Sequence, residues 1–562
     1  MAATLASPAA PSTSGPTSDQ AMSLRVKVTA VGISQAQLET LEKALPQNKA
    51  LAPLLQGSNY RLLYTDSLER EGKRPATAAT RFRSVFYNYT RAEAIVVEGS
   101  LGEPGAALVH VRQNWQPEVN DAEFQDAVAV LMSDRELGPA LAAHNLVAYR
   151  PMPPVQGWAE DAVTERIVNV GLRPQAVSED FQHEIVGVNL AQRIIVHYPG
   201  GAPRRASALD QLCGLPAAGQ ETTRRGTAGQ YQLTVTDEGG TVLWDMLVTR
   251  PSVSSGTNAS GIELQDVKYK GHAVLKRAHI PILNVLYGEG SCGPYRDWLY
   301  QEGMFQADGV DIEGAPGFRD CGATPATTFL ETGDDVGNFR GVALYRQGTE
   351  VVLVTEMEAG WYRYIHEWGF DADGTIHPRF GFGATANSCT CFAHTHHAYF
   401  RFDFDVDGPV NAIYELPLRS AAGGGTPIAT EKKIFRNESG PMYYRIRGAK
   451  RSYLLYPGTE DGNSDDYGQG DMWFLHWHDG PDPVAAEIDD GHSIFGPTEA
   501  DLDQFLTGEA LKKQDCVVWY HASFVHTPDN PADGRPTPVE GVRPATLSGP
   551  EVVGPDLVPV GY

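Results

Sequence analysis

The feature that most constrains the fold is a run of alternating polar and apolar residues at 394–408 (His-Thr-His-His-Ala-Tyr-Phe-Arg-Phe-Asp-Phe-Asp-Val-Asp-Gly). Alternation with many aromatic residues is typical of a β-strand. Because alternate side chains of a strand share a face, His394 and His396 are expected to point the same way. Two such imidazoles supply two ligands of a metal site, which then needs a third ligand from elsewhere. Solvated histidines on a strand edge are the alternative.

Short alternating runs separated by turns recur along the 562 residues, which include 58 glycines and 38 prolines. This pattern favours a mainly β protein. A chain of this length is too long for a single hydrophobic core, so it should divide into roughly two to four domains.

The expected organisation begins with a disordered tail over residues 1–23, which lacks the basic start and apolar centre of a signal peptide. Residues 24–135 form a small α+β domain, with helices expected at 34–45 and 121–134 and a strand at 92–99. Residues 136–255 form a second small α+β domain, with strands at 145–151 and 242–244. The remaining residues, 256–562, form the largest domain, whose first strand is expected at 262–269.

The formal net charge of −25 argues against nucleic acids and anionic membrane surfaces as partners. It favours attraction of cationic substrates, or it simply maintains solubility. No stretch approaches the roughly 20 apolar residues that span a bilayer. Six cysteines in a long chain without a secretion signal are expected to be reduced thiols, and the cytoplasm is the expected location.

Three segments resemble the copper-containing amine oxidases. Residues 394–408 resemble the strand that carries two copper-binding histidines in that family. Residues 360–376 contain Gly-Trp-Tyr-Arg-Tyr and then Asp-Gly-Thr-Ile, and they resemble the segment whose tyrosine is oxidised to topaquinone. Residues 517–528, with Val-Val-Trp-Tyr and Val-His-Thr-Pro, resemble the segment that supplies the third copper histidine. The resemblance is strong from residue 261 to the end and thin before it.

The resemblance implies a large antiparallel β-sandwich over 256–562 that binds copper and forms a homodimer, preceded by two small α+β domains. It also implies an oxidoreductase that uses O2 and a small-molecule substrate. Tyr362 corresponds to the topaquinone precursor, and Tyr287 corresponds to the tyrosine that hydrogen-bonds the quinone. The implied copper ligands are His394, His396 and His526.

The chain departs from the family at the catalytic base. Counting from Tyr287 without a gap, the position of the family's aspartate is occupied by Gln301; a short insertion would place Gln306 there. An amide has no useful basicity and cannot abstract a proton near pH 7. A shifted loop would bring in another carboxylate, for which the candidates are Asp297, Glu302 and Asp308.

Both neighbours of Tyr362 also depart from the family. Trp361 replaces the usual asparagine, and Arg363 replaces the usual acidic residue. These substitutions change the volume of the pocket around Tyr362 and the electrostatic field there. An inward-pointing Arg363 would repel the ammonium form of an amine and attract a carboxylate or a phenolate.

Four further side chains remain to be assigned. Cys389 and Cys391 precede His394, and on a regular strand both thiols would share the face opposite to that histidine. They are expected to be small core residues, or supplementary metal ligands if a bulge resets the alternation. Asp403 and Asp405 are candidates for a peripheral calcium or manganese site that would lack further partners.

Three functions follow from these residues. The favoured one is a divergent copper- and O2-dependent oxidase or oxygenase acting on a non-standard, acidic or phenolic, substrate. The first alternative is a primary-amine oxidase that uses topaquinone at Tyr362 to give aldehyde, ammonia and peroxide. The second alternative is a non-catalytic copper-binding scaffold.

Overall fold

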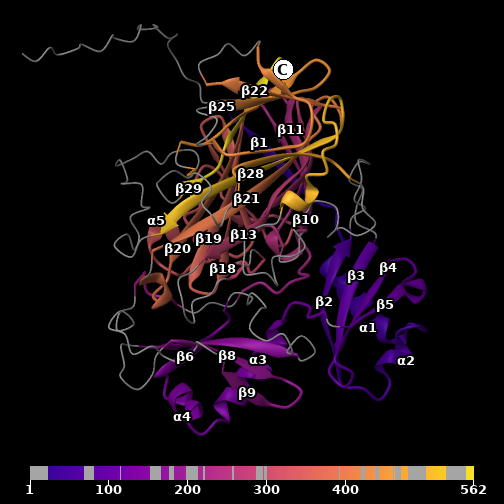
Figure 1. Cartoon of the computed structure of the whole chain (residues 1–562), viewed down its shortest axis with the longest axis vertical. Coiled ribbons are helices and arrows are strands. Elements are labelled where there is room, and N and C mark those ends of the chain that lie inside the picture. The colour runs from indigo at the N-terminus through magenta and orange to yellow at the C-terminus, as the bar shows by residue number, and fades with distance from the viewer. Residues whose placement is uncertain are drawn as a thin grey trace, which may run out of the picture.

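The protein is mainly β, with two large, mostly antiparallel sheets and two small ones, as the computed structural model shows (Figure 1). The structure describes residues 23–68, 81–113, 115–151, 166–175, 183–197, 213–218, 222–255, 259–286, 295–296, 300–391, 393–418, 424–436, 442–459, 461–462, 470–478, 502–526 and 552–562.

The first small unit is a four-stranded sheet covered by short helices. Its strands run in the order β2 (Tyr60–Leu68), β3 (Arg81–Asn88), β4 (Glu93–Ser100) and β5 (Leu108–Gln113). The helices α1 (Gln35–Ala44) and α2 (Ala52–Leu55) supply leucines to its core. The side chain of Ser34 caps α1 by accepting a hydrogen bond from the backbone of Gln37, so the helix begins close to its expected position.

The second small unit has the same plan and lies below the large sheets in Figure 1. Its sheet has the order β6 (Leu146–Tyr149), β7 (Ile167–Pro174), β8 (Glu184–Asn189) and β9 (Ile194–His197). The helices α3 (Asp121–Met132) and α4 (Leu137–Ala142) pack on one face of this sheet. The expected helix at 121–134 and strands at 92–99 and 145–151 are therefore confirmed to within a few residues.

The first large sheet carries the sequence-predicted histidines. In spatial order its strands are β1 (Arg25–Ala30), β10 (Gln230–Thr236), β11 (Val242–Thr249), β12 (Glu263–Tyr269), β13 (His272–Leu286), β21 (His394–Phe404), β28 (Cys516–His526), β27 (Met472–His476) and β24 (Lys432–Ile434), with β14 (Tyr295–Arg296) on β13. The strand expected at 242–244 forms, but it pairs within this sheet and not within a small one.

The second large sheet carries Tyr362 on β19. Its order is β15 (Val310–Asp311), β16 (Phe318–Asp320), β17 (Val342–Gln347), β18 (Glu350–Ala359), β19 (Tyr362–Asp371), β20 (Ile376–Ala384), β30 (Asp556–Val560), β26 (Ser452–Tyr456), β25 (Met442–Arg447), β22 (Ala412–Pro417) and β23 (Thr426–Ile428), with β29 (Val552–Val553) on β20. The short helix α5 (Phe329–Thr332) lies beside β20.

The two large sheets pack face to face through one apolar core. Phe400 and Phe402 of β21 enter it from the first sheet, and Tyr364, Phe380 and Phe382 enter it from the second. Alternation along each strand directs every second side chain into this core, which is the arrangement of a β-sandwich. The predicted fold class, a large antiparallel β-sandwich preceded by two small α+β units, is confirmed. The strands β1, β10 and β11 belong to the large sheet, although their residues fall within the expected small domains. The domain boundaries at 135 and 255 stay predictions.

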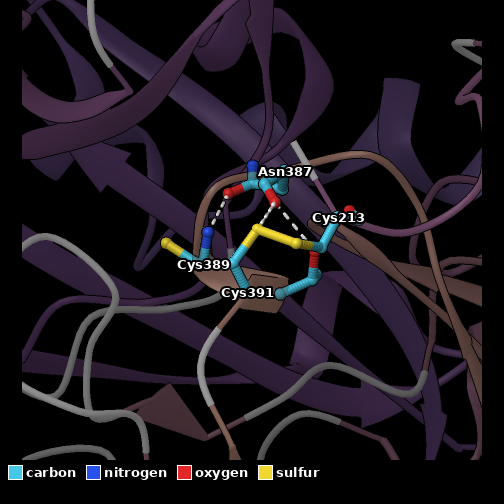
Figure 2. Close-up of a disulfide and its surroundings, with 5 residues drawn as sticks. Cys213, Asn387, Cys389 and Cys391 are labelled. Carbon is cyan, nitrogen blue, oxygen red and sulfur yellow. Dashed lines mark hydrogen bonds between the residues drawn. A yellow bond between two sulfur atoms is a disulfide. The ribbon is translucent and has the colours of Figure 1, made fainter. Parts of the chain in front are cut away.

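The cysteines near His394 do not lie on a strand. Residues Cys389–Cys391 form a 3-10 turn, and Cys391 is joined by a disulfide to Cys213, 178 residues earlier (Figure 2). The expectation that these thiols are reduced and face away from His394 on a strand is therefore wrong. Thr390 donates a hydrogen bond to the backbone oxygen of Asn387 at 2.8 Å, which stabilises the turn. A structural disulfide is typical of oxidising compartments.

In the described residues, no helix is long and apolar enough to cross a membrane.

Candidate metal centre and adjoining pocket

Three histidines come together at one end of the first large sheet. His394 and His396 lie at the start of β21, and His526 ends β28. The two strands are antiparallel, and His394 lies directly opposite His526 in the register. Because cross-strand partners share a face and residues two apart share a face, all three imidazoles project into the sandwich.

The donor atoms of these imidazoles lie within 4.8 Å of one another. Nε2 of His394 is 3.4 Å from Nδ1 of His526. The three side chains are almost completely buried, with exposures of 6%, 0% and 2% for His394, His396 and His526. Buried histidines at this separation satisfy the geometry of a three-nitrogen metal site.

Burial favours the neutral form, which is the form that binds metals, in two of these histidines. Burial holds the pKa of His396 well below its usual value, and the neighbouring histidines lower that pKa further. Burial lowers the pKa of His526 to about 4. Nε2 of His396 is buried and has no hydrogen-bond partner among the described residues, while its Nδ1 lies 3.0 Å from the hydroxyl of Tyr364. The residues present therefore fit a copper or zinc ion.

Tyr362 approaches the histidines from the second large sheet. Its hydroxyl lies 2.5 Å from Nε2 of His394, and its ring centre lies 4.8 Å from that of His396. Tyr362 and Tyr364 alternate with Arg363 along β19, so the two tyrosines face the sandwich interior and the arginine faces away. The predicted constellation of three histidines and Tyr362 is thus one contiguous cluster between the sheets.

A cavity of about 450 Å³ lies next to this cluster. Its walls come from the β18–β19 hairpin and from the second small unit. Tyr362 is not among its lining residues, whereas Trp361 is. The Trp361 ring is 6.2 Å from Tyr362 on one side and 6.2 Å from Tyr149 on the other, so it lies between the cavity and the tyrosine.

Gln301 lines this cavity. Its amide nitrogen lies 3.4 Å from the hydroxyl of Thr222. Two of the acidic substitutes point elsewhere: Glu302 forms a buried ion pair with Arg250, and Asp308 is exposed. Neither carboxylate lines the cavity.

Tyr287 and Asp297 lie outside the described residues.

Glu358 is a carboxyl group of this cavity that the sequence did not reveal. Its backbone nitrogen donates a hydrogen bond to the backbone oxygen of Gln301 at 2.7 Å. Oε2 of Glu358 is buried and has no hydrogen-bond partner among the described residues. Burial raises the pKa of this carboxyl, although the charge of Arg363 opposes the effect. A carboxyl group therefore stands beside Gln301.

The positive charge of Arg363 is compensated by Asp335. The guanidinium makes two bonds to this carboxylate, with Nε–Oδ1 at 2.5 Å and Nη2–Oδ2 at 2.7 Å. Both side chains are buried. Because the charge is paired, the expected repulsion of cationic substrates by Arg363 is largely cancelled.

Asp403 and Asp405 form a second cluster together with Asp515, which the sequence did not suggest. Their carboxylate oxygens lie within 4.8 Å of one another. Asp515 directly precedes β28, so it reaches the end of β21 through the pairing of the two strands.

No protein-family model matches this sequence. No curated protein matches it either.

Solved structures do match over nearly the whole chain. A copper-containing benzylamine oxidase from Hansenula polymorpha superposes with a TM-score of 0.58 at 14% identity, covering 94% of this chain and 97% of that one. An amine oxidase from Aspergillus nidulans gives 0.53 at 14% identity, covering 94% and 87%. A lysyl oxidase from Pichia pastoris gives 0.54 at 12% identity, covering 94% and 89%. The chain has the β-sandwich fold of the copper amine oxidases.

Proposed function

We propose that this chain is a copper- and O2-dependent oxidoreductase that holds one copper through His394, His396 and His526. The observation that carries the proposal is the His396 ring, whose Nε2 is buried without a partner among the described residues and which has a ring nitrogen within 4.8 Å of a nitrogen of each of the other two histidines. A buried polar atom without a partner costs about 1–3 kcal/mol, and a bound metal removes that cost. Likeness to copper oxidases in fold supports the same conclusion.

Copper bound there would supply one-electron chemistry and a site for O2. The chain's own residues prepare the site. The hydroxyl of Tyr364 orients the His396 ring, and Phe382 and Phe524 stack on that ring at 4.4 and 5.1 Å and exclude water. The hydroxyl of Tyr362 is directed at the ligand atom of His394.

The substrate of this enzyme is assigned to the 450 Å³ cavity. Gln301 can orient it through hydrogen bonds but cannot take its proton. Glu358 can hold a proton at Oε2, the oxygen that has no partner. Trp361 replaces a small polar residue of the resembled family and fills the space between the cavity and Tyr362. These departures favour a divergent oxidase or oxygenase over a conventional amine oxidase.

A primary-amine oxidase is the second candidate, and one observation favours it. The 2.5 Å approach of the Tyr362 hydroxyl to His394 leaves this tyrosine at the metal site, where a topaquinone precursor would have to be. Phenylhydrazine separates the two candidates, because it forms a coloured adduct with a quinone carbonyl and none with an unmodified tyrosine. An adduct in copper-loaded protein that is lost in Tyr362→Phe would establish the second candidate.

Metal analysis tests the proposal directly. We expect one copper per chain in the parent protein and a nitrogen-rich type 2 electron paramagnetic resonance spectrum. His526→Ala should lose tightly bound copper, whereas His110→Ala, which removes an exposed histidine on β5, should retain it. Equal copper content in parent and His526→Ala would refute the ligand assignment.

We also propose a homodimer built on the β-sandwich, as the resemblance implies. A two-fold arrangement is the commonest closed assembly of identical chains. Light scattering at micromolar concentration should return about twice the 61.0 kDa mass of the chain. A mass near 61.0 kDa would remove this proposal.

A further inference from the structure

The cavity beside the histidine cluster has aromatic walls. Phe124 of α3 and Tyr149 of β6 line it from the second small unit, and Trp361 lines it from the β18–β19 hairpin. Tyr149 lies over its cross-strand partner Gly171, where a Cβ atom would overlap the tyrosine ring. A cavity of about 450 Å³ with such walls suits a single aromatic ring that bears short polar substituents.

The three arginines that line the cavity differ in how their charges are balanced. Arg150 donates to Asp121 at 2.8 Å and to the hydroxyl of Tyr300 at 2.9 Å. Arg363 is paired with Asp335. Arg173 has neither an ion-pair partner nor a hydrogen-bond partner in the part of the chain that the structure describes.

Arg173 is held at the cavity by β7, where it is the cross-strand partner of Val147. Its strand neighbour Leu172 points into the core of the small unit, so the arginine points to the opposite face, toward the hairpin. The side chain is partly buried, and burial together with the charge of Arg363 lowers its pKa. A guanidinium nevertheless keeps its charge at neutral pH, so among the described residues of the cavity Arg173 is a cation that no carboxylate pairs with directly.

We propose that this cavity binds a small aromatic monocarboxylate, with the carboxylate on Arg173 and the ring against Tyr149 and Trp361. The proposal deepens the proposed function, because it names the substrate class of that oxidoreductase and rests on it for turnover. A guanidinium matches a carboxylate through two parallel hydrogen bonds. The free Oε2 of Glu358 accepts a hydrogen bond from a hydroxyl or amino group elsewhere on the ligand.

The charges around the cavity disfavour dianionic, cationic and neutral ligands. Glu358 and Asp121 line the same cavity, so a dianion such as a phosphate monoester would meet repulsion that one unpaired arginine cannot offset. A simple arylalkyl amine would place a second cation beside Arg173. A neutral ring compound would leave the arginine without a counter-ion.

A matched ligand series tests the proposal. The probes are 4-hydroxyphenylacetate, tyrosol and tyramine, which share a phenol ring and differ in carrying an anionic, a neutral or a cationic end. Calorimetric titration of the full-length protein should show binding of 4-hydroxyphenylacetate about 10- to 100-fold tighter than that of the other two, as expected for a charge-assisted hydrogen-bonded pair. Equal or tighter binding of tyramine would overturn the proposal.

A matched pair of variants gives the second test. Arg173→Gln should weaken binding of 4-hydroxyphenylacetate about 10- to 100-fold. Arg447→Gln, which removes an exposed arginine of β25, should leave it unchanged. Undiminished binding by folded Arg173→Gln would refute the assignment. If Arg173→Gln does not fold, the ligand series on the parent protein decides the question.

Titrating metal-free protein separates this inference from the proposed function. Binding of 4-hydroxyphenylacetate without copper supports the cavity assignment even if the histidines hold no copper. Loss of copper in His526→Ala supports the metal assignment even if no carboxylate binds. Copper-loaded protein that shows no selectivity for the carboxylate would refute only the cavity assignment.

Discussion

The hydroxyl of Tyr364 lies 3.0 Å from Nδ1 of His396, so Nε2 of that ring, which has no partner among the described residues, is the atom left to bind a metal. A hydrogen bond of this kind fixes the tautomer and the orientation of a metal-binding histidine. We therefore expect Tyr364→Phe to weaken copper binding about 10- to 100-fold while the protein remains folded. Competition with a chelator of known copper affinity measures the change.

Tyr60→Phe is the control for this variant, because Tyr60 lies on β2 with part of its side chain exposed. Its copper affinity should equal that of the parent. Unchanged affinity in Tyr364→Phe would mean that the Phe382 and Phe524 rings alone hold His396 in place.

The disulfide between Cys213 and Cys391 fixes one wall of the cavity. Residues 213–218 run beside 384–387 through backbone hydrogen bonds, and Ala217, Thr385 and Asn387 line the cavity. Removing a native disulfide typically costs about 2–5 kcal/mol. We expect Cys391→Ser to melt at a lower temperature than the parent and to bind cavity ligands more weakly.

Cys516→Ser is the matched control, because Cys516 is a buried cysteine outside any disulfide. Differential scanning calorimetry should show a smaller loss for it than for Cys391→Ser. Titration of free thiols in denatured, unreduced protein provides a direct check: reactive thiols at both Cys213 and Cys391 would contradict the disulfide.

The sequence predicted those parts of the site that strand periodicity and resemblance determine. Alternation over 394–404 was enough to place His394 and His396 on one face, and β21 has that form. The pairing that brings His526 opposite His394 joins strands 132 residues apart, so only the resemblance suggested it. The predicted antiparallel sandwich rested on both kinds of argument.

Other parts depend on long-range packing that no local pattern encodes. Arg173 becomes a cavity residue only because the second small unit docks against the β18–β19 hairpin. Cys213 and Cys391 form a disulfide although 178 residues separate them in the sequence. The 3-10 turn that precedes β21 has no periodic pattern from which it could be predicted. Glu358 lies on β18, far along the chain from Gln301, so no pattern in the sequence around Gln301 indicates it.

Stability should fall as the pH rises from about 5 to about 8, because Glu356 of β18 is buried. Burial raises the pKa of this carboxyl to about 8, although Oε2 accepts a hydrogen bond from the backbone of Phe329 at 2.7 Å. The unfolded chain ionises this group near pH 4.3, so between the two values the native state binds the extra proton. The free energy that this protonated carboxyl adds to native stability is fully present below the unfolded-state pKa and is lost once the pH reaches the native-state pKa of about 8.

Glu356→Gln removes this titration while keeping an acceptor for the Phe329 amide. We expect the loss of stability between pH 5 and 8, measured from urea unfolding, to shrink by an amount on the order of 3 kcal/mol. Glu39→Gln, an exposed substitution on α1, should leave the profile unchanged. An identical pH profile for Glu356→Gln and the parent would show that this carboxyl is ionised in the native state.

Primary amines should be poor substrates, because Gln301 occupies the position expected for the base. A positioned base typically contributes about 10²- to 10⁴-fold to the rate of proton transfer, and an amide cannot supply it. Gln301→Asp should therefore gain peroxide release from tyramine if Tyr362 is a quinone, and Gln301→Asn, which shortens the side chain without adding a carboxylate, should not. The new carboxyl would lie beside that of Glu358, and because two adjacent carboxyls do not readily ionise together, the pair holds a proton to higher pH and the gained activity shifts toward higher pH. Rapid peroxide release from tyramine by the parent protein would contradict the prediction and favour the amine-oxidase alternative.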